Sequence, residues 1–510
     1  MLDDEQRDYY DTHTWRPLSE TVVDLGGITD ASGITDAARD AMGLLVDEYR
    51  SHAAHNQTLR DYYDGNVKVS DYGVTASVKN DQACDWPEKA VNDWAERIEL
   101  ERLVLPDGAT DEDAALVDRI VDANDLINNY NQHVPVKGLY GCMAATVNRR
   151  EGGGSLVRFH GADTFTAIPS PDFTDGVVAC GFAIARREFT SWQRDHMVPT
   201  IVNLHMPGNV GEFRQVADGE WVYSDGPTRE ELPTLYVFAH RRVGTVAPFG
   251  RTRITKFVRT LTDDAIRCLF HMQVSGAFYA MAKLWATGLT DEQFDAMMED
   301  KDKFQLARML LLTANEDTGR DPNVGQLSGN SPQPFIDELR SLAAQFSGAT
   351  GVPLNSLGIV QDNPSSAEAI QAAREDIAMI ARRDIKADGA TLRRVMRAAM
   401  AVELNTTTDA LPAELSGVRA EFADPILHTL SERADWALKV NSVREGFGQT
   451  DVGARAMGIG DAQLAELKAE EQRALAQQML STLFSAPASE PALEPAPPSD
   501  GEVSDDAAAS

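Results

Sequence analysis

The sequence predicts an α+β fold, because the spacing of its apolar residues changes twice along the chain. Before Tyr140 and after Arg251 the apolar residues recur about every 3.6 positions, as on one face of a helix. Between Tyr140 and His240 they alternate with polar residues, as on a half-buried strand. The composition is 43% apolar and 25% charged, ordinary for a globular chain, and 510 residues suggest roughly two to four folding units.

The N-terminal part is predicted to be an acidic arm followed by helices. Residues 1–38 carry nine acids and two bases without an apolar period, so we expect a loosely packed arm. Helices are predicted over about Ala38–Tyr62, Lys89–Leu103 and Asp111–Val136. The first stops before Gly65, since glycine can take the positive φ of a helix C-cap.

A mostly antiparallel sheet is predicted for the middle of the chain. Its strand-like stretches are connected by glycine, proline or aspartate, the residues of tight turns. We interpret the triple glycine 152–154 as a hairpin turn rather than a phosphate cradle, because it does not open a helix. The predicted strands are Ala144–Asn148, Leu156–His160, Val177–Arg187, Thr200–His205, Gly211–Val216, Glu220–Tyr223 and Leu235–His240.

Two helices flank an irregular insertion after residue 250. The first helix is predicted to run over Arg251–Ala286, although Thr262 followed by two aspartates could be an N-cap that splits it. The insertion Thr290–Ser331 begins acidic and has little pattern. A short amphipathic helix is predicted over Pro334–Phe346.

A glycine-rich loop, Ser347–Asn363, leads into the clearest helix start in the chain. Ser365 and Glu368 have the spacing of a capping box, and the helix runs to about Leu404. Gly389 costs about 1 kcal/mol relative to alanine there, so a kink is expected. One strand and two helices follow, predicted over Val418–Phe422, Leu430–Val440 and Asp461–Leu483.

The last 26 residues, 485–510, carry five prolines, six acids and no base. Such a segment cannot bury enough apolar surface to offset its chain entropy, so a disordered acidic tail is predicted. No stretch approaches the ~20 apolar residues of a membrane helix, and the acidic start lacks a signal-peptide pattern. We therefore expect no membrane partner.

The net charge of −32 excludes a protein whose whole surface is positively charged and binds nucleic acid. Bases nevertheless gather locally, with six and no acid in residues 241–259. A second cluster of bases lies on the helix that runs to about Leu404. The two clusters either touch a polyanion or pair with acidic surfaces of a neighbouring domain or subunit. The second cluster comprises Arg374, Arg382, Arg383, Lys386, Arg393, Arg394 and Arg397.

Catalytic signatures are missing from the sequence. It has no P-loop, no nucleophile elbow, no zinc-protease motif and no EF-hand loop. The four cysteines lie far apart, so reduced thiols are expected. Glu48, His52 and His55 share a helix face, but a solvated surface explains them better than a metal site. We expect no enzymatic activity and no cofactor.

Two architectures are compatible with the long helices. Helices of over ~50 Å need something to pack along, and side-by-side identical subunits would supply it. A large α+β monomer with helices broken at Thr262 and Gly389 fits the same pattern.

Five segments of the sequence together resemble the portal proteins of tailed bacteriophages, in the siphovirus type common among phages of actinobacteria. The order of the elements from about residue 39 to 484 also resembles that family, whereas Thr252 stands where the family usually has serine. The segments are Leu59–Gly65, Leu235–Arg242, Gly250–Ile254, Ala349–Val360 and Asn363–Ile370.

The resemblance implies a homo-oligomeric ring, probably of 12 subunits, at one capsid vertex of the virion, assembled in the host cytoplasm. Double-stranded DNA would pass through its channel during packaging and ejection. Further implied partners are the terminase large subunit, the major capsid and scaffold proteins, and the head-tail connector (adaptor) protein. The alternatives are another capsid-associated structural protein or an uncharacterised α+β hydrolase.

The family's parts are carried over by segment. After the arm, the wing would be 39–250, stem helix 1 would be 251–286, the clip 287–332, stem helix 2 333–346, the tunnel loop 347–363, the long helix and wing return 364–435, the crown 436–484 and the tail 485–510. The channel candidates are Arg251, Arg253, Lys256, Arg259, Arg382, Arg383 and Lys386. The tunnel-loop candidates are Gly348, Gly351, Pro353, Asn355, Gly358, Gln361 and Asn363.

Overall fold

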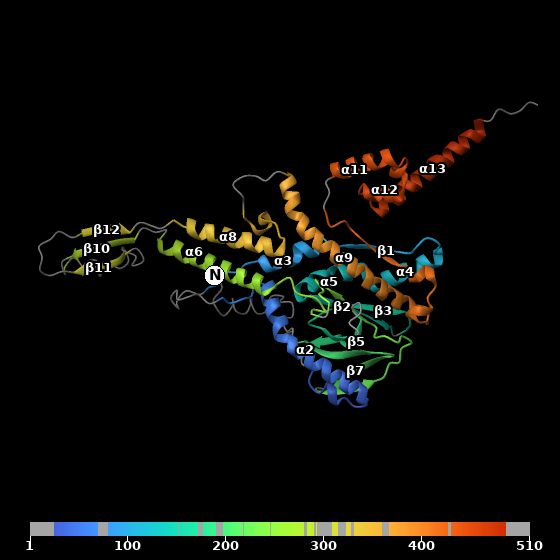
Figure 1. Cartoon of the computed structure of the whole chain (residues 1–510), viewed down its shortest axis with the longest axis horizontal. Helices are drawn as coiled ribbons and strands as arrows, with labels where there is room; N and C mark the ends of the chain where they lie inside the picture. Colours follow the sequence, from blue (N-terminus) through green and yellow to red (C-terminus); the bar gives the residue numbers. More distant parts are fainter. Residues whose placement is uncertain are drawn as a thin grey trace, which may run out of the picture. The chain divides into compact units, whose positions relative to one another are not determined.

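The computed structural model of the chain describes residues 25–485, except for 70–79, 151, 172–176, 190–196, 218, 245, 280–282, 290–291, 293–308, 315–322, 328–330, 360–366 and 427–429. The chain divides into two compact units, residues 1–426 and 427–510. The first combines helices with mainly antiparallel sheets, which confirms the predicted α+β class (Figure 1). Ser365 of the predicted capping box lies outside the described residues, as does the predicted tail apart from its first residue, Ser485.

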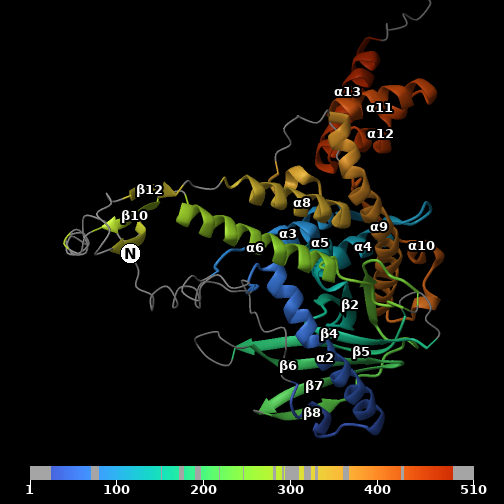
Figure 2. The same ribbon diagram turned by 60° about the vertical axis from the view of Figure 1, so that its left-hand side comes forward.

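A five-stranded antiparallel sheet forms one end of the first unit (Figure 2). Its order is β4-β5-β6-β7-β8. The apolar side chains of α2 (Asp36–Tyr63) pack across one face of this sheet, against side chains that alternate along the strands. The described end of the predicted arm belongs to the same core, since Leu25 and Ile28 are buried there. The strands are β4 (Phe165–Pro169), β5 (Val178–Phe189), β6 (Met197–Met206), β7 (Asn209–Ala217) and β8 (Glu220–Ser224).

A three-stranded antiparallel sheet lies in the main core, in the order β3-β2-β9. Helices α5 (Leu126–Tyr140) and α9 (Ala367–Glu403) both contact it. The triple glycine 152–154 joins the first two strands with positive φ at each residue, which confirms the predicted hairpin turn. The strands are β2 (Cys142–Arg149), β3 (Ser155–Gly161) and β9 (Leu235–Ala239).

Two predicted helices of the N-terminal half were wrong in extent. The stretch read as Lys89–Leu103 divides into α3 (Trp86–Ala95) and strand β1 (Leu100–Val104). The second divides into α4 (Asp111–Asn124) and α5, because Asp125 adopts φ 44° between them. β1 is a strand because it pairs antiparallel with the distant β13 (Arg419–Phe422), a contact that local periodicity cannot reveal.

The helix predicted over Arg251–Ala286 is also shorter than expected. α6 covers Lys256–Tyr279, and the following residues form strand β10 (Lys283–Leu289). That strand lies between β11 (Met309–Ala314) and β12 (Asn323–Leu327), so part of the patternless insertion is a small sheet.

Helix α6 lies beside α8 (Gln333–Thr350), as both views show. The thiol of Cys268 in α6 donates a hydrogen bond to the carbonyl oxygen of Phe335, at 3.2 Å. After η3 (Leu354–Leu357), α9 runs without interruption through Gly389 for 37 residues, about 55 Å at 1.5 Å per residue. The segment between α9 and strand β13 contains η4 (Thr408–Ala410) and α10 (Ala413–Ser416).

The second unit is helical, as predicted. It consists of α11 (Leu430–Val443), η5 (Phe447–Gln449), α12 (Asp451–Ala456) and α13 (Asp461–Ser485). The rings of Trp436 and Phe447 meet edge to face at 5.5 Å between centroids, which holds α11 against η5. Within the described residues of both units, no helix is long and apolar enough to span a bilayer.

Candidate nucleic-acid interface

Three predicted channel residues lie on the exposed side of α9. Arg382, Arg383 and Lys386 are exposed, whereas Asp384 and Asp388 of the same turns are buried. Arg382 lies 3.5 Å from the carboxylate of Asp424, with both side chains about half exposed. An exposed ion pair contributes little free energy, so this contact leaves the guanidinium able to change partner.

The C-terminal half of the same basic cluster has a structural role. Arg393 donates from Nε to the carbonyl oxygen of Val418 at 3.1 Å, and Arg397 donates to the carbonyl oxygen of Thr408 at 3.0 Å. These bonds brace the segment that returns from α9 to β13. For these two bases the hydrogen bonds go to backbone oxygens of the same unit, which neither interpretation of the sequence predicted.

The four channel candidates at the start of α6 also include both exposed and buried bases. Arg251 and Lys256 are exposed, and Arg259 is partly buried, with its guanidinium 5.9 Å from the ring centre of Tyr62. Arg253 is 4% exposed and lies inside the unit. We therefore do not propose Arg253 as a channel residue, because its buried guanidinium group is not accessible to a polyanion.

Arg253 instead joins three elements. Its Nε donates to the carbonyl oxygen of Ala90 in α3 at 2.5 Å, and a terminal nitrogen donates to that of Thr350 at 2.7 Å. Thr350 is the last residue of α8, where orphan carbonyls favour a cation. The guanidinium also lies 5.5 Å from the centre of the Trp94 ring. It therefore fixes the start of α6 against the end of α8.

Backbone contacts fix the same entry point. The amide of Arg251 donates to the carbonyl oxygen of His240 at 2.8 Å, and the amide of Arg253 donates to that of Gly138 at 2.9 Å. Gly250 has φ +83°, and a Cβ there would lie 2.3 Å from the His240 carbonyl oxygen and 2.6 Å from that of Gly141. Only glycine allows this approach of three chain segments.

A buried charge network lies beneath the exposed bases of α9. Lys137 of α5 forms an ion pair with Asp388, which also accepts a hydrogen bond from the Tyr130 hydroxyl at 2.5 Å. Both ionised side chains are essentially inaccessible to solvent, at 0% and 1%. One helical turn earlier, Asp384 lies 2.6 Å from Nδ1 of His240.

The electrostatics of the network follow from its burial. Desolvation lowers the pKa of His240 to about 4, despite the bond to Asp384, so the imidazole is neutral near pH 7 and donates from Nδ1. Desolvation opposes ionisation of Asp384, but the bond with His240 and the Lys137 ammonium lower its pKa overall. Complete burial raises the pKa of Asp388. The Lys137 ammonium lies against the carboxylate of Asp388, so this buried anion has a counter-ion.

Lys137 and the two aspartates are not among the residues predicted from the sequence to be functional. A signal was present: Lys137 continues the apolar face Leu126, Tyr130 and Val134 of α5, all of them buried. A lysine on a buried helix face needs a partner charge. Periodicity cannot say that the partner lies 251 residues away.

The predicted tunnel loop begins later than expected. Gly348 lies within α8, and the helix ends at Gly351, where φ is +79° and the Cβ position lies 3.5 Å from Ile377 of α9. Pro353 is buried just before η3, whereas Asn355 within η3 and Gly358 directly after it are exposed. Gln361 and Asn363 fall outside the described residues. The loop thus begins at Gly351, close to α9.

Comparison with known proteins gives one family and two relatives. The model of the family described as "Phage portal protein, SPP1 Gp6-like" matches residues 44–477. A protein named "Portal protein" from Mycobacterium phage D29 is 27% identical over 288 residues, 56% of this chain and 58% of the relative. A protein of the same name from Mycobacterium phage L5 is 25% identical over 281 residues, 54% and 56% of the two chains. The alignments therefore span somewhat more than half the length of these curated relatives.

Proposed function

Because the chain belongs to the SPP1 Gp6-like family of phage portal proteins, we propose that identical copies form a ring at one vertex of a phage capsid. Double-stranded DNA would pass through the centre of the ring during packaging and ejection. The observation that carries this proposal is the family match over residues 44–477, which includes the sheets, α6, α8, α9 and most of the second unit. We propose twelve subunits, the number that the resemblance implies.

Within this proposal each segment has a role. The two sheets and the helices before α6 form the wing, which faces the capsid protein. Helices α6 and α8 form the stem, and β10–β12 form the clip, which contacts the packaging motor and later the head-tail connector. Residues 351–363 form the tunnel loop, and the second unit forms the crown.

The charge distribution suits a conduit that must not hold its cargo. Each copy has a net charge of −32, so a ring of copies repels DNA over most of its surface. The exposed bases Arg382, Arg383 and Lys386 would form a local positive belt that centres the duplex. Phosphate contacts of this kind are screened by salt and exchange readily, so the duplex can slide.

The proposed role is structural. The energy for packaging would come from a partner, the terminase large subunit, since the sequence contains no P-loop. The major capsid and scaffold proteins and the head-tail connector complete the proposed partners, and the proposed location is the capsid vertex of the virion. The bases at the entry to α6, Arg251, Lys256 and Arg259, are proposed as a second set that DNA approaches.

Charge reversal on α9 tests the DNA-centring role. We expect Arg382→Glu/Arg383→Glu to assemble normally but to lower DNA packaging, measured as nuclease-protected DNA per particle. The control Arg39→Glu/Arg50→Glu makes the same charge change on exposed positions of α2. Packaging equal to wild type in the α9 variant would overturn the role of these bases while leaving the ring itself in place.

A further inference from the structure

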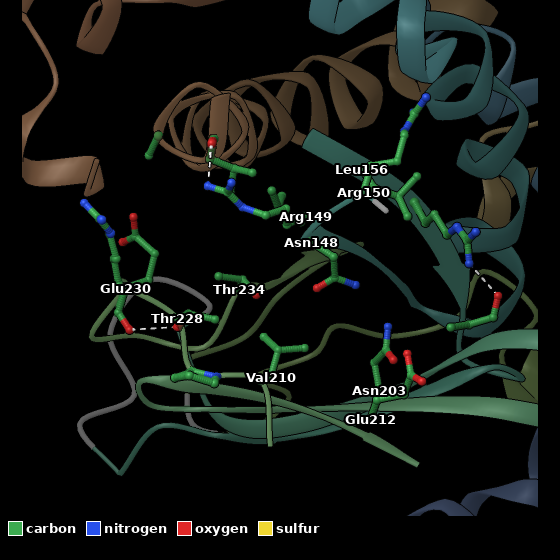
Figure 3. A pocket seen from close by; sticks show the side chains of 18 of the residues that line it. Asn148, Arg149, Arg150, Leu156, Asn203, Val210, Glu212, Thr228, Glu230 and Thr234 are labelled. Atoms are coloured by element: carbon green, nitrogen blue, oxygen red, sulfur yellow. Dashed lines mark hydrogen bonds between the residues drawn. The ribbon is translucent and has the colours of Figure 1, made fainter. Parts of the chain in front are cut away.

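A pocket lined by arginines lies between the two sheets of the first unit, at the end of α9. Its volume is about 880 Å³, and its walls come from β2–β3, from β5–β7, from residues 226–230 and from residues 401–406. Figure 3 shows Asn148 and Arg149 on one side, with Asn203 and Glu212 on the sheet below them. This face of the sheet is opposite the one that α2 covers, because lining residues such as Asn203 alternate with core residues such as Val202.

The lining of this arginine pocket is unusual for so acidic a chain. Six arginines and two glutamates contribute to its walls, whereas acids outnumber bases 79 to 47 overall. A concentration of guanidinium groups in a concave site raises the local concentration of anionic ligands. The arginines are Arg149, Arg150, Arg158, Arg186, Arg214 and Arg229.

Uncharged oxygen atoms hold four of these guanidinium groups in place. Arg149 donates to the side-chain oxygen of Asn405 at 3.0 Å, and Arg229 donates to the backbone oxygen of the same residue at 2.6 Å. Arg150 donates to the backbone oxygen of Ala123 at 3.0 Å, and Arg158 to that of Ala185 at 2.5 Å. These bonds orient the guanidinium groups without neutralising them, and each group has further N–H donors.

The other two arginines are held by weak ion pairs. Arg186 lies 2.9 Å from Glu188, and Arg214 lies 2.8 Å from Glu212; the arginine side chains are 61% and 50% exposed. Exposed pairs of this kind are worth little, so both guanidinium groups can exchange a neighbouring carboxylate for one supplied by a ligand.

Asn148 adds an acceptor to the pocket wall. Its side-chain oxygen is buried and has no hydrogen-bond partner in the described part of the chain. A buried polar atom without a partner carries a desolvation cost that a ligand can remove. A peptide backbone N–H supplies the donor that this oxygen lacks, and a polyphosphate does not.

We propose that the arginine pocket binds an extended acidic segment of a partner protein. Carboxylates of the segment bond the guanidinium groups in the geometry that arginine favours, and one backbone N–H donates to Asn148. The volume lies in the range of pockets that enclose small ligands, so the pocket can take a few side chains of such a segment. A DNA duplex is a convex rod that cannot enter such a site. The inference is independent of the proposed channel, because no residue of the pocket belongs to the channel set.

Fluorescence anisotropy with a labelled peptide of alternating glutamate and threonine tests this inference on the full chain. We expect saturable binding to wild type and no binding of the same peptide with glutamine in place of glutamate. The variant Arg186→Gln/Arg214→Gln should weaken binding about tenfold. The control Arg39→Gln/Arg50→Gln removes two exposed charges from α2, on the other face of the sheet, and should bind like wild type.

Three results would overturn the inference. The first is an absence of saturable binding to wild type. The second is an equal loss of affinity in both double variants, which would indicate attraction to overall charge. The third is displacement of the peptide by a duplex oligonucleotide whose own affinity falls in Arg186→Gln/Arg214→Gln, because the pocket would then bind nucleic acid. Melting temperatures of both double variants equal to that of wild type would establish that folding is unaffected.

Discussion

Nδ1 of His240 lies 2.6 Å from Oδ2 of Asp384, although 144 residues separate them in the sequence. His240 follows strand β9, and Asp384 lies on the buried face of α9. One helical turn further, Asp388 binds Lys137 of α5. Two carboxylates on successive turns thus attach α9 to the core. This attachment determines which residues of α9 face outward, and Arg382 and Arg383 are among them.

Breaking the buried ion pair should be costly. Lys137→Met leaves Asp388 without its counter-ion, so we expect the free energy of unfolding to fall by about 3–5 kcal/mol, measured by urea denaturation. In Lys137→Met/Asp388→Asn the buried charge is gone and Tyr130 keeps an acceptor, so most of the loss should be recovered. Arg39→Met, which removes an exposed pair with Asp36, should cost at most about 1 kcal/mol. A similar small cost for Lys137→Met would show that the pair is not buried.

Acid should destabilise the protein before its carboxylates titrate. Burial lowers the pKa of His240 to about 4 and those of His160 and His205 to about 3. In the unfolded chain these groups bind protons near pH 6.5, so protons favour the unfolded state as the pH falls from about 6.5 towards 4. Each histidine should lower the free energy of unfolding by on the order of 3 kcal/mol between pH 6.5 and its own lowered pKa.

The measurement is the free energy of unfolding at a series of pH values between 7 and 4.5. His240→Gln, which keeps a donor for Asp384, should reduce the slope. Stability that does not change over this interval would contradict the buried, neutral state of all three histidines.

Gly250 lies where three chain segments meet, so a side chain at this position should destabilise the protein. Gly250→Ala places a Cβ against two backbone oxygens at a positive φ, so we expect a loss of more than about 2 kcal/mol in stability. Gly208→Ala is the matched control, because Gly208 has φ +70° but open space around its Cβ position. Its cost should stay near about 1 kcal/mol. Equal costs for the two would mean that backbone conformation, rather than the crossing, decides the effect.

Apolar residues exposed on the proposed stem helix α6 and on the long helix α9 should be covered in the ring. Phe257 of α6 and Met379 of α9 are 51% and 59% exposed in the single chain. Phe257→Asp should therefore prevent assembly, measured by size-exclusion chromatography with light scattering, while leaving the melting temperature of the monomer unchanged. Leu44→Asp, at a 62% exposed position of α2, should assemble normally. Normal assembly of Phe257→Asp would remove α6 from the proposed subunit contact.

Local periodicity was sufficient to predict the α+β class and most of the strands, because side-chain alternation in the sheets is a property of each segment. It failed where a distant partner decides the structure. The predicted helix continues to Ala286, but residues from Lys283 onward form β10, since this segment pairs with β11 and β12. Leu100–Val104 reads as helix but pairs with β13. The short strand β4 (Phe165–Pro169) was missed because five residues give too few alternations.

For the candidate site, too, the sequence predicts local features but not those that depend on distant parts of the chain. Charge counts located the basic clusters, and the family resemblance drawn from co-linear motifs is confirmed by the match over residues 44–477. Charge alone cannot distinguish Arg382, which is exposed, from Arg253, which is buried against two carbonyl oxygens. That distinction depends on where α3 and α8 lie in space.

The central claim is that identical copies of this chain surround a channel. Electron microscopy of the purified protein viewed down its axis, with the particle mass measured in parallel, tests it most directly. The account predicts rings of about twelve subunits with an open centre, each subunit contributing 55.7 kDa. A solitary 55.7 kDa molecule, both alone and when co-expressed with the capsid protein of its phage, would contradict it.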